Sequence, residues 1–136
     1  MIKENSLKSR GGRDLETYFS EVTRIPKLRE HLKPRFINEH GTQQVIDSDF
    51  CLELDDETLF FDLTTSFRSD RAKQKAYSGL CCKAMCQNGK NYSFYIVIPD
   101  GEAVKYYKRT KPFALEGLDG VLSLTDAVDL IQEKRR

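Results

Sequence analysis

Residues 48–65, SDFCLELDDETLFFDLTT, contain the clearest strand signals of the chain. Apolar and polar residues alternate over 50–54, and alternation resumes over 58–65. A period of two is typical of strands, because successive side chains point to opposite faces of a sheet. Asp55 and Asp56 supply turn chemistry between the two segments. The stretch therefore predicts two antiparallel strands joined in a hairpin.

Helix and strand signals alternate through the rest of the chain. Apolar residues from Leu15 to Val22 recur at the spacing of one helix face, and Pro26 ends that pattern. Tyr92 to Ile98 is a continuous apolar run, which is typical of a strand covered on both faces in the middle of a sheet. We expect helices over 13–25, from 66 or 69 to 85, and from 125 onward, shorter helices over 27–32 and after 101, and further strands over 42–49, 92–98 and 120–124.

The predicted order of elements is α, β, β, β, α, β, α, β, α. Strands that cluster first and then alternate with helices indicate an α/β fold with a mixed central β-sheet flanked by helices. A chain of 136 residues has the usual size of one domain. We therefore expect a flexible basic lead over residues 1–12 and a single domain over 13–136.

Composition excludes several classes of protein. Hydrophobic residues make up 39% of the chain and charged residues 32%, the balance of an ordinary globular protein. The apolar runs are far shorter than the roughly 20 residues that span a bilayer, and the N-terminus lacks the apolar stretch of a secretory signal. We expect no membrane partner and a cytoplasmic location. The sequence also lacks the glycine patterns of a P-loop, a dinucleotide site and a serine-hydrolase elbow.

Two acids of the predicted hairpin are the clearest candidates for a functional site. Asp49 and Asp62 fall on adjacent antiparallel strands, where both can reach the same edge of the sheet. Two carboxylates a few ångströms apart repel each other unless a cation neutralises them, and hard cations such as Mg²⁺ or Mn²⁺ prefer oxygen ligands. Such an ion can activate water for attack on a phosphodiester. The alternative is that both acids are solvent-facing strand residues.

The pair also carries a family resemblance. Ser48-Asp49-Phe50, followed by Asp62-Leu63-Thr64 at the end of the next strand, resembles the PD-(D/E)XK nuclease superfamily. By element order the resemblance covers residues 13–124. It implies a restriction-endonuclease-like αβββαβ core in which Asp49 and Asp62 bind the metal, with the Leu63 carbonyl as an extra ligand. It also implies cleavage of nucleic acid, DNA in preference to RNA, by a homodimer or together with a larger recognition subunit.

The sequence departs from this family at one position, because Thr64 stands where the family usually has a catalytic lysine. Other branches of the superfamily take a polar site residue from the helix that follows. That predicted helix offers Lys73 and Lys75. Lys73 shares a helix face with Tyr77 and Leu80, so we expect it to point inward as the preferred catalytic lysine. Lys75 points more sideways; it is a second catalytic candidate, and a solvated helix residue is the favoured alternative for it.

Some family members add a glutamate from the first helix. Glu16 and Glu21 both flank the apolar stripe of that helix, and Glu16, which follows the basic lead, is the better candidate; a solvated helix glutamate is the alternative for either. Asp47 and Glu53 are further candidates if the strand register differs. For nucleic-acid phosphates, basic residues near the predicted site are the expected contacts. These are Lys8, Arg10, Arg13, Arg68 and Arg71.

These observations support a divalent-metal-dependent endonuclease, either structure-selective or a cleavage subunit whose target is chosen elsewhere. Thr64 keeps a second hypothesis open: a catalytically inactive nuclease-fold module that binds nucleic acid or a larger protein partner. A third is an interaction subunit whose basic and aromatic surface docks on a larger protein. An exposed apolar patch in place of an acidic pocket would favour the third.

Overall fold

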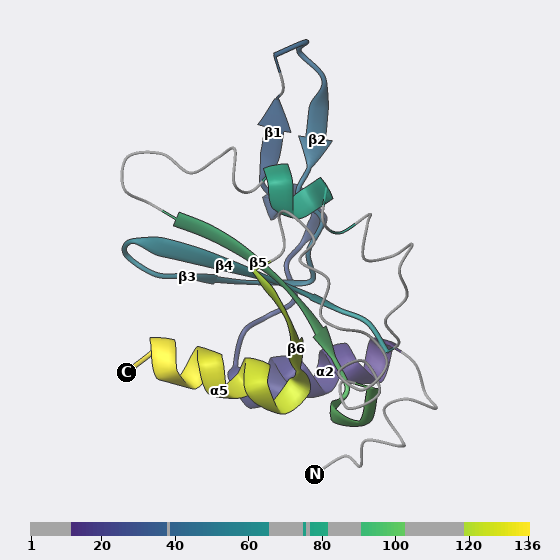
Figure 1. Ribbon diagram of the computed structural model, residues 1–136, viewed down its shortest axis with the longest axis vertical. Helices are drawn as coiled ribbons and strands as arrows, with labels where there is room; N and C mark the ends of the chain where they lie inside the picture. The colour runs from purple at the N-terminus through teal and green to yellow at the C-terminus, as the bar shows by residue number, and fades with distance from the viewer. Residues whose placement is uncertain (1–11, 38, 66–74, 76, 82–90, 103–118) are drawn as a thin grey trace.

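The computed structural model describes residues 12–37, 39–65, 75, 77–81, 91–102 and 119–136 (Figure 1). The fold is mixed α/β, with a central four-stranded sheet and helices packed against it. This agrees with the fold class predicted from the sequence. Among the described helices, none combines the length and the apolar character needed to cross a membrane.

The predicted hairpin forms one half of the central sheet. β3 (Phe50–Glu53) pairs antiparallel with β4 (Glu57–Leu63), and Phe50 lies opposite Phe61. β5 (Asn91–Ile98) runs parallel to β4 on its other side, and β6 (Gly120–Ser123) runs parallel to β5. The order β3-β4-β5-β6 makes the sheet mixed and places β5 in its interior, as predicted.

Two helices from opposite ends of the chain cover one face of the sheet. α2 (Gly12–Thr23) and α5 (Leu124–Lys134) lie side by side beneath the strands (Figure 1). The ring of Phe19 is 4.8 Å from that of Phe50 and 5.9 Å from that of Phe61, measured between centroids. Leu15, Leu59, Val97, Ala127 and Ile131 complete the centre of this core.

A smaller cluster covers the opposite face. It contains Ile46, Phe60, Cys81 and Phe94, all buried. Neighbouring residues of β4 therefore pack into different clusters, Phe60 into this one and Phe61 into the first. Both faces of β4 are covered, so its second half buries the carboxylate of Asp62 as well as the rings of Phe60 and Phe61.

A second sheet consists of a short hairpin, of which the sequence predicted only the second strand. β1 (Arg35–Ile37) pairs antiparallel with β2 (Gln43–Val45), and the hairpin projects away from the central sheet (Figure 1). The expected strand over 42–49 is wrong in length, and β1 was not expected at all. Strands of three residues are too short to show a clear apolar period, and the side chain of Ile37 is exposed although it is apolar.

Helix boundaries differ from prediction by one or two residues. α2 ends at Thr23, whose hydroxyl donates to the carbonyl of Phe19 at 2.7 Å. The terminal helix begins at Leu124 rather than Thr125, because the Ser123 hydroxyl caps it by accepting from the Asp126 amide at 3.1 Å. Only a single turn, η1 (Glu30–Leu32), forms within 27–32. Residues 75, 77–81 and 100–102 are helical, which agrees with the helices predicted after 66 and, one residue early, after 101.

Candidate active site

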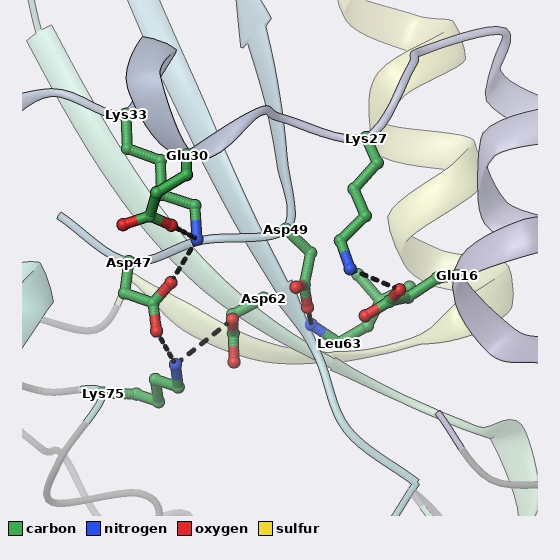
Figure 2. A network of polar contacts seen from close by, with 9 residues as sticks. All are labelled: Glu16, Lys27, Glu30, Lys33, Asp47, Asp49, Asp62, Leu63 and Lys75. Carbon is green, nitrogen blue, oxygen red and sulfur yellow. Dashed lines mark hydrogen bonds and ion pairs between the residues drawn. The ribbon is translucent and has the colours of Figure 1, made fainter. Parts of the chain in front are cut away.

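A cleft of about 870 Å³ opens where β3 begins and β4 ends. α2 and the segment after it form one wall, and the helical residue Lys75 lies on the other side (Figure 2). Acidic side chains dominate the lining. The carboxylates are Glu16, Glu21, Asp47, Asp49 and Asp62, and the lysines are Lys27 and Lys75.

Asp49 is fixed to the neighbouring strand by two hydrogen bonds. Its backbone N–H donates to the carbonyl of Phe61 at 3.0 Å, which continues the β3–β4 ladder by one residue. Its Oδ2 accepts from the backbone N–H of Leu63 at 2.8 Å. Asp49 and Asp62 therefore lie at one edge of adjacent antiparallel strands, as the sequence predicted.

Asp62 is the most deeply buried carboxylate of the cleft, with 5% of its side chain exposed. Its Oδ1 lies 3.3 Å from Nζ of Lys75, while its Oδ2 is buried and has no hydrogen-bond partner among the described residues. Burial, followed by the nearby charge of Asp49, raises the pKa of Asp62 to about 7, and Lys75 opposes that rise. The site thus holds a carboxylate oxygen that no described group of the protein satisfies.

Burial also raises the pKa of Asp49. The hydrogen bond from Leu63 opposes this shift, and the negative charge of Glu16 adds to it. Both central carboxylates are therefore less stable as anions than exposed ones would be. A positive charge placed between them would lower the energy of the ionised pair.

Lys75, the second candidate lysine, is part of the cleft, so the alternative of a solvated helix residue is wrong for it. Only 12% of its side chain is exposed. The predicted inward face is also wrong, because Tyr77 and Leu80 are 50% and 44% exposed whereas Cys81 is buried. Lys73, the lysine preferred from the sequence, lies outside the described residues.

Asp47 connects two lysines at the mouth of the cleft. Its Oδ1 lies 2.5 Å from Nζ of Lys33, and its Oδ2 lies 3.4 Å from Nζ of Lys75 (Figure 2). Lys33 in turn lies 3.2 Å from the carboxylate of Glu30. The hydrogen bond from Lys33 is the largest cause of the lowered pKa of Asp47. The sequence named Asp47 only as a reserve candidate and gave no role to Lys33.

Glu16 lines the cleft, as the sequence predicted, but its carboxylate is paired. Nζ of Lys27 donates to its Oε2 at 2.8 Å, and this hydrogen bond raises the pKa of Lys27. Lys27 is 57% exposed and was not predicted as a site residue. Glu53, the other reserve candidate, lies elsewhere, in a second hollow of about 450 Å³ shared with Phe60 and Tyr92.

The residues predicted to contact nucleic acid fall largely outside the described part of the chain. Arg13 lies in the first turn of α2, but its side chain is not described. Lys8, Arg10, Arg68 and Arg71 are outside the described residues altogether.

No group of three or more His, Cys, Asp or Glu side chains among the described residues is arranged to hold a metal ion. Two of the acids are engaged in ion pairs, because Glu16 binds Lys27 and Asp47 binds Lys33 and Lys75. Asp49 and Asp62 are the two acids that remain at the centre. The buried, unsatisfied Oδ2 of Asp62 is the donor that fits a hard cation best.

No family model, curated protein or solved structure matches this chain significantly.

Proposed function

We propose that this protein is a divalent-metal-dependent endonuclease that hydrolyses phosphodiester bonds of nucleic acid, with DNA as the preferred substrate. The observation that carries the proposal is the pair Asp49 and Asp62: two neighbouring carboxylates with raised pKa values, one of which has a buried oxygen without a partner among the described residues. Perturbed carboxylates that converge in a cleft are typical of catalytic and metal-binding sites.

The donor set fits Mg²⁺ or Mn²⁺. Asp62 Oδ2 and the Asp49 carboxylate are hard oxygen donors, and the Leu63 peptide lies beside them because its N–H donates to Asp49. When bound by these oxygens, such an ion would lower the pKa of an attacking water and stabilise charge on the phosphate. We propose Asp49, Asp62 and the Leu63 carbonyl as its ligands.

The lysines of the cleft provide the positive charge that Thr64 cannot. Nζ of Lys75 lies against Asp62 and can donate to a phosphate oxygen or to the water that attacks it. Lys27 is more exposed and is suited to holding the backbone of the substrate near Glu16. Asp49 keeps its orientation through the Leu63 hydrogen bond while the substrate binds.

The arrangement supports the wider proposal of a restriction-endonuclease-like core. An acid at the start of one strand, a second acid near the end of its antiparallel neighbour and a lysine from the following helix converge in one cleft. We also propose that it acts as a homodimer or beside a larger recognition subunit, as the family resemblance implies.

The test is cleavage of labelled duplex, single-stranded and branched DNAs, and of RNA, in Mg²⁺ or Mn²⁺. Wild type should cut at least one substrate, and Asp62→Asn and Lys75→Met should each reduce the rate by about 100-fold or more. The matched controls are Glu53→Gln, on β3 but in the other hollow, and Lys134→Met, whose lysine pairs with Glu57 away from the cleft. Both controls should cut like wild type.

Binding without cleavage in both metals would refute the enzyme and leave the inactive nucleic-acid-binding module. Equal loss of activity in the controls and in the cleft variants would also refute it, because the effect would not come from the cleft.

A further inference from the structure

The Lys75 ammonium has a second carboxylate neighbour besides Asp62. Its side chain is long and flexible, and an isolated ion pair holds such a chain only weakly. In this protein a second carboxylate, that of Asp47, lies 3.4 Å from the same ammonium. Nζ of Lys75 thus lies between Asp62 Oδ1 and Asp47 Oδ2 (Figure 2).

Asp47 is itself held in place, although 59% of its side chain is exposed. Lys33 binds its other oxygen at 2.5 Å, and Glu30 lies 3.2 Å from the same lysine. The Lys33 side chain is only 11% exposed, so it is a stable anchor. Charges of alternating sign therefore run from Glu30 through Lys33, Asp47 and Lys75 to Asp62.

We propose that Asp47, anchored by Lys33, is a positioning residue that holds the Lys75 ammonium over Asp62. This inference deepens the proposed function, on which its catalytic meaning rests. Asp47 does not touch the reacting atoms in this account. It acts through Lys75, by limiting the positions that the ammonium occupies when a phosphate enters the cleft.

Two features make Asp47 suited to this role. It follows the projecting hairpin directly, two residues after the end of β2, and it precedes Asp49 by two residues. The backbone that places Asp49 against β4 thus also places Asp47 at the mouth of the cleft. The partners of Asp47 come from two other segments, because Lys33 follows η1 and Lys75 belongs to the helical segment after β4.

The first test measures where Lys75 is, without metal and without substrate. Brief acetylation of the whole protein, followed by mass spectrometry, gives the labelling rate of each lysine. Asp47→Asn should raise labelling of Lys75 by about tenfold, the factor that corresponds to loss of one charge-assisted hydrogen bond. Asp47→Glu, which keeps the charge, should restore much of the protection, and labelling of Lys134 should not change in either variant.

A second variant protects the test against misfolding. Lys33→Met leaves Asp47 in the chain but removes its anchor, so it should raise labelling of Lys75 by a smaller factor than Asp47→Asn. Thermal unfolding of each variant shows whether it is folded at the labelling temperature. If Lys75 in folded Asp47→Asn is labelled no faster than in wild type, Asp47 does not position it and the proposal is wrong.

Cleavage then connects the position of Lys75 to catalysis. Asp47→Asn should lower kcat by about tenfold with little change in KM, because substrate binding is retained while the ammonium is displaced. Asp47→Glu should recover part of kcat. A wild type that never cuts, together with faster labelling in Asp47→Asn, would refute the proposed function but support the positioning role. Faster labelling with unchanged kcat would refute the catalytic part of this inference alone.

Discussion

The Asp49 carboxylate accepts a hydrogen bond from the backbone N–H of Leu63, at 2.8 Å across the β3–β4 hairpin. Leu63 directly follows Asp62 on β4, so this bond holds Asp49 close to the second acid of the cleft. Burial destabilises the charged form of both acids, and the charge of Asp49 adds to this effect at Asp62, as the charge of Glu16 does at Asp49. Ionising both acids therefore costs free energy in the folded protein.

Removing the charge of Asp49 while keeping its hydrogen bond should not destabilise the protein. In Asp49→Asn the amide oxygen can still accept from Leu63, and repulsion of Asp62 is lost. In Asp49→Ala the Leu63 N–H loses its acceptor, which typically costs about 1–3 kcal/mol. Urea unfolding at pH 8 should give Asp49→Asn a stability equal to or above that of wild type, and Asp49→Ala a lower one. The reverse order would contradict the described hydrogen bond.

Stability should fall as the pH rises through the range in which Asp62 ionises. The pKa of Asp62 is raised from 3.8 to about 7 in the folded protein, so between these values the folded state binds more protons than the unfolded state. Linkage then requires the free energy of unfolding to decrease with pH, by up to roughly 4 kcal/mol for this group alone. Above pH 7 its contribution levels off.

Asp62→Asn isolates this effect. Urea titrations from pH 4 to 9 give the free energy of unfolding of both proteins. We expect the value for wild type minus the value for Asp62→Asn to decrease as the pH rises from about 4 to 7. The lowered pKa of Asp47 acts in the opposite direction and at lower pH, and it is present in both proteins. A difference that does not change with pH would show that Asp62 is ionised normally.

Divalent metal should stabilise the folded protein if Asp49 and Asp62 bind it. With Mg²⁺ or Mn²⁺ at 100 times its dissociation constant, the free energy of unfolding should rise by about 2.7 kcal/mol. The gain should be lost in Asp62→Asn and kept in Glu53→Gln. Unfolding in matched ionic strength, with Na⁺ replacing the divalent ion, separates binding from screening. An equal gain in wild type and Asp62→Asn would place the ion elsewhere.

A lysine at position 64 should partly replace Lys75. Thr64 follows Asp62 by two residues and extends the ladder, since its N–H donates to the carbonyl of Val97 at 3.0 Å. Its side chain should therefore emerge on the same face as Asp62. If cleavage needs a cation beside the acids, Lys75→Met with Thr64→Lys should cut faster than Lys75→Met with Thr64→Met. Equal rates in the two double variants would show that position 64 cannot supply that charge.

Much of the central sheet was predictable because its signals are local. Alternation over 50–54 and 58–65 gave the hairpin, and the unbroken apolar run of β5 gave an interior strand. Antiparallel pairing across a short turn then brings Asp49 and Asp62 together without further information. The structure places all three expected ligand residues, Asp49, Asp62 and Leu63, in one cleft. Metal binding itself stays a prediction.

The surrounding residues depended on tertiary contacts that local patterns do not encode. Tyr77 and Leu80 suggested the inward face of their helix, yet both are substantially exposed, and Lys75 points into the cleft instead. Large apolar side chains misled the assignment because they do not always face the core. Lys33 and Asp47 meet only because the β1–β2 hairpin returns the chain to its starting point. A pairing of three residues leaves almost no periodic signal.

Plasmid nicking shows whether Asp62 belongs to a metal-dependent nuclease site. Purified wild type and Asp62→Asn are each incubated with supercoiled plasmid in Mg²⁺, in Mn²⁺ and in excess chelator. We expect wild type to nick in at least one metal and not in chelator, and Asp62→Asn to nick at a rate lower by about 100-fold or more. Nicking that persists at the wild-type rate in Asp62→Asn, or no nicking by wild type in either metal, would contradict this expectation.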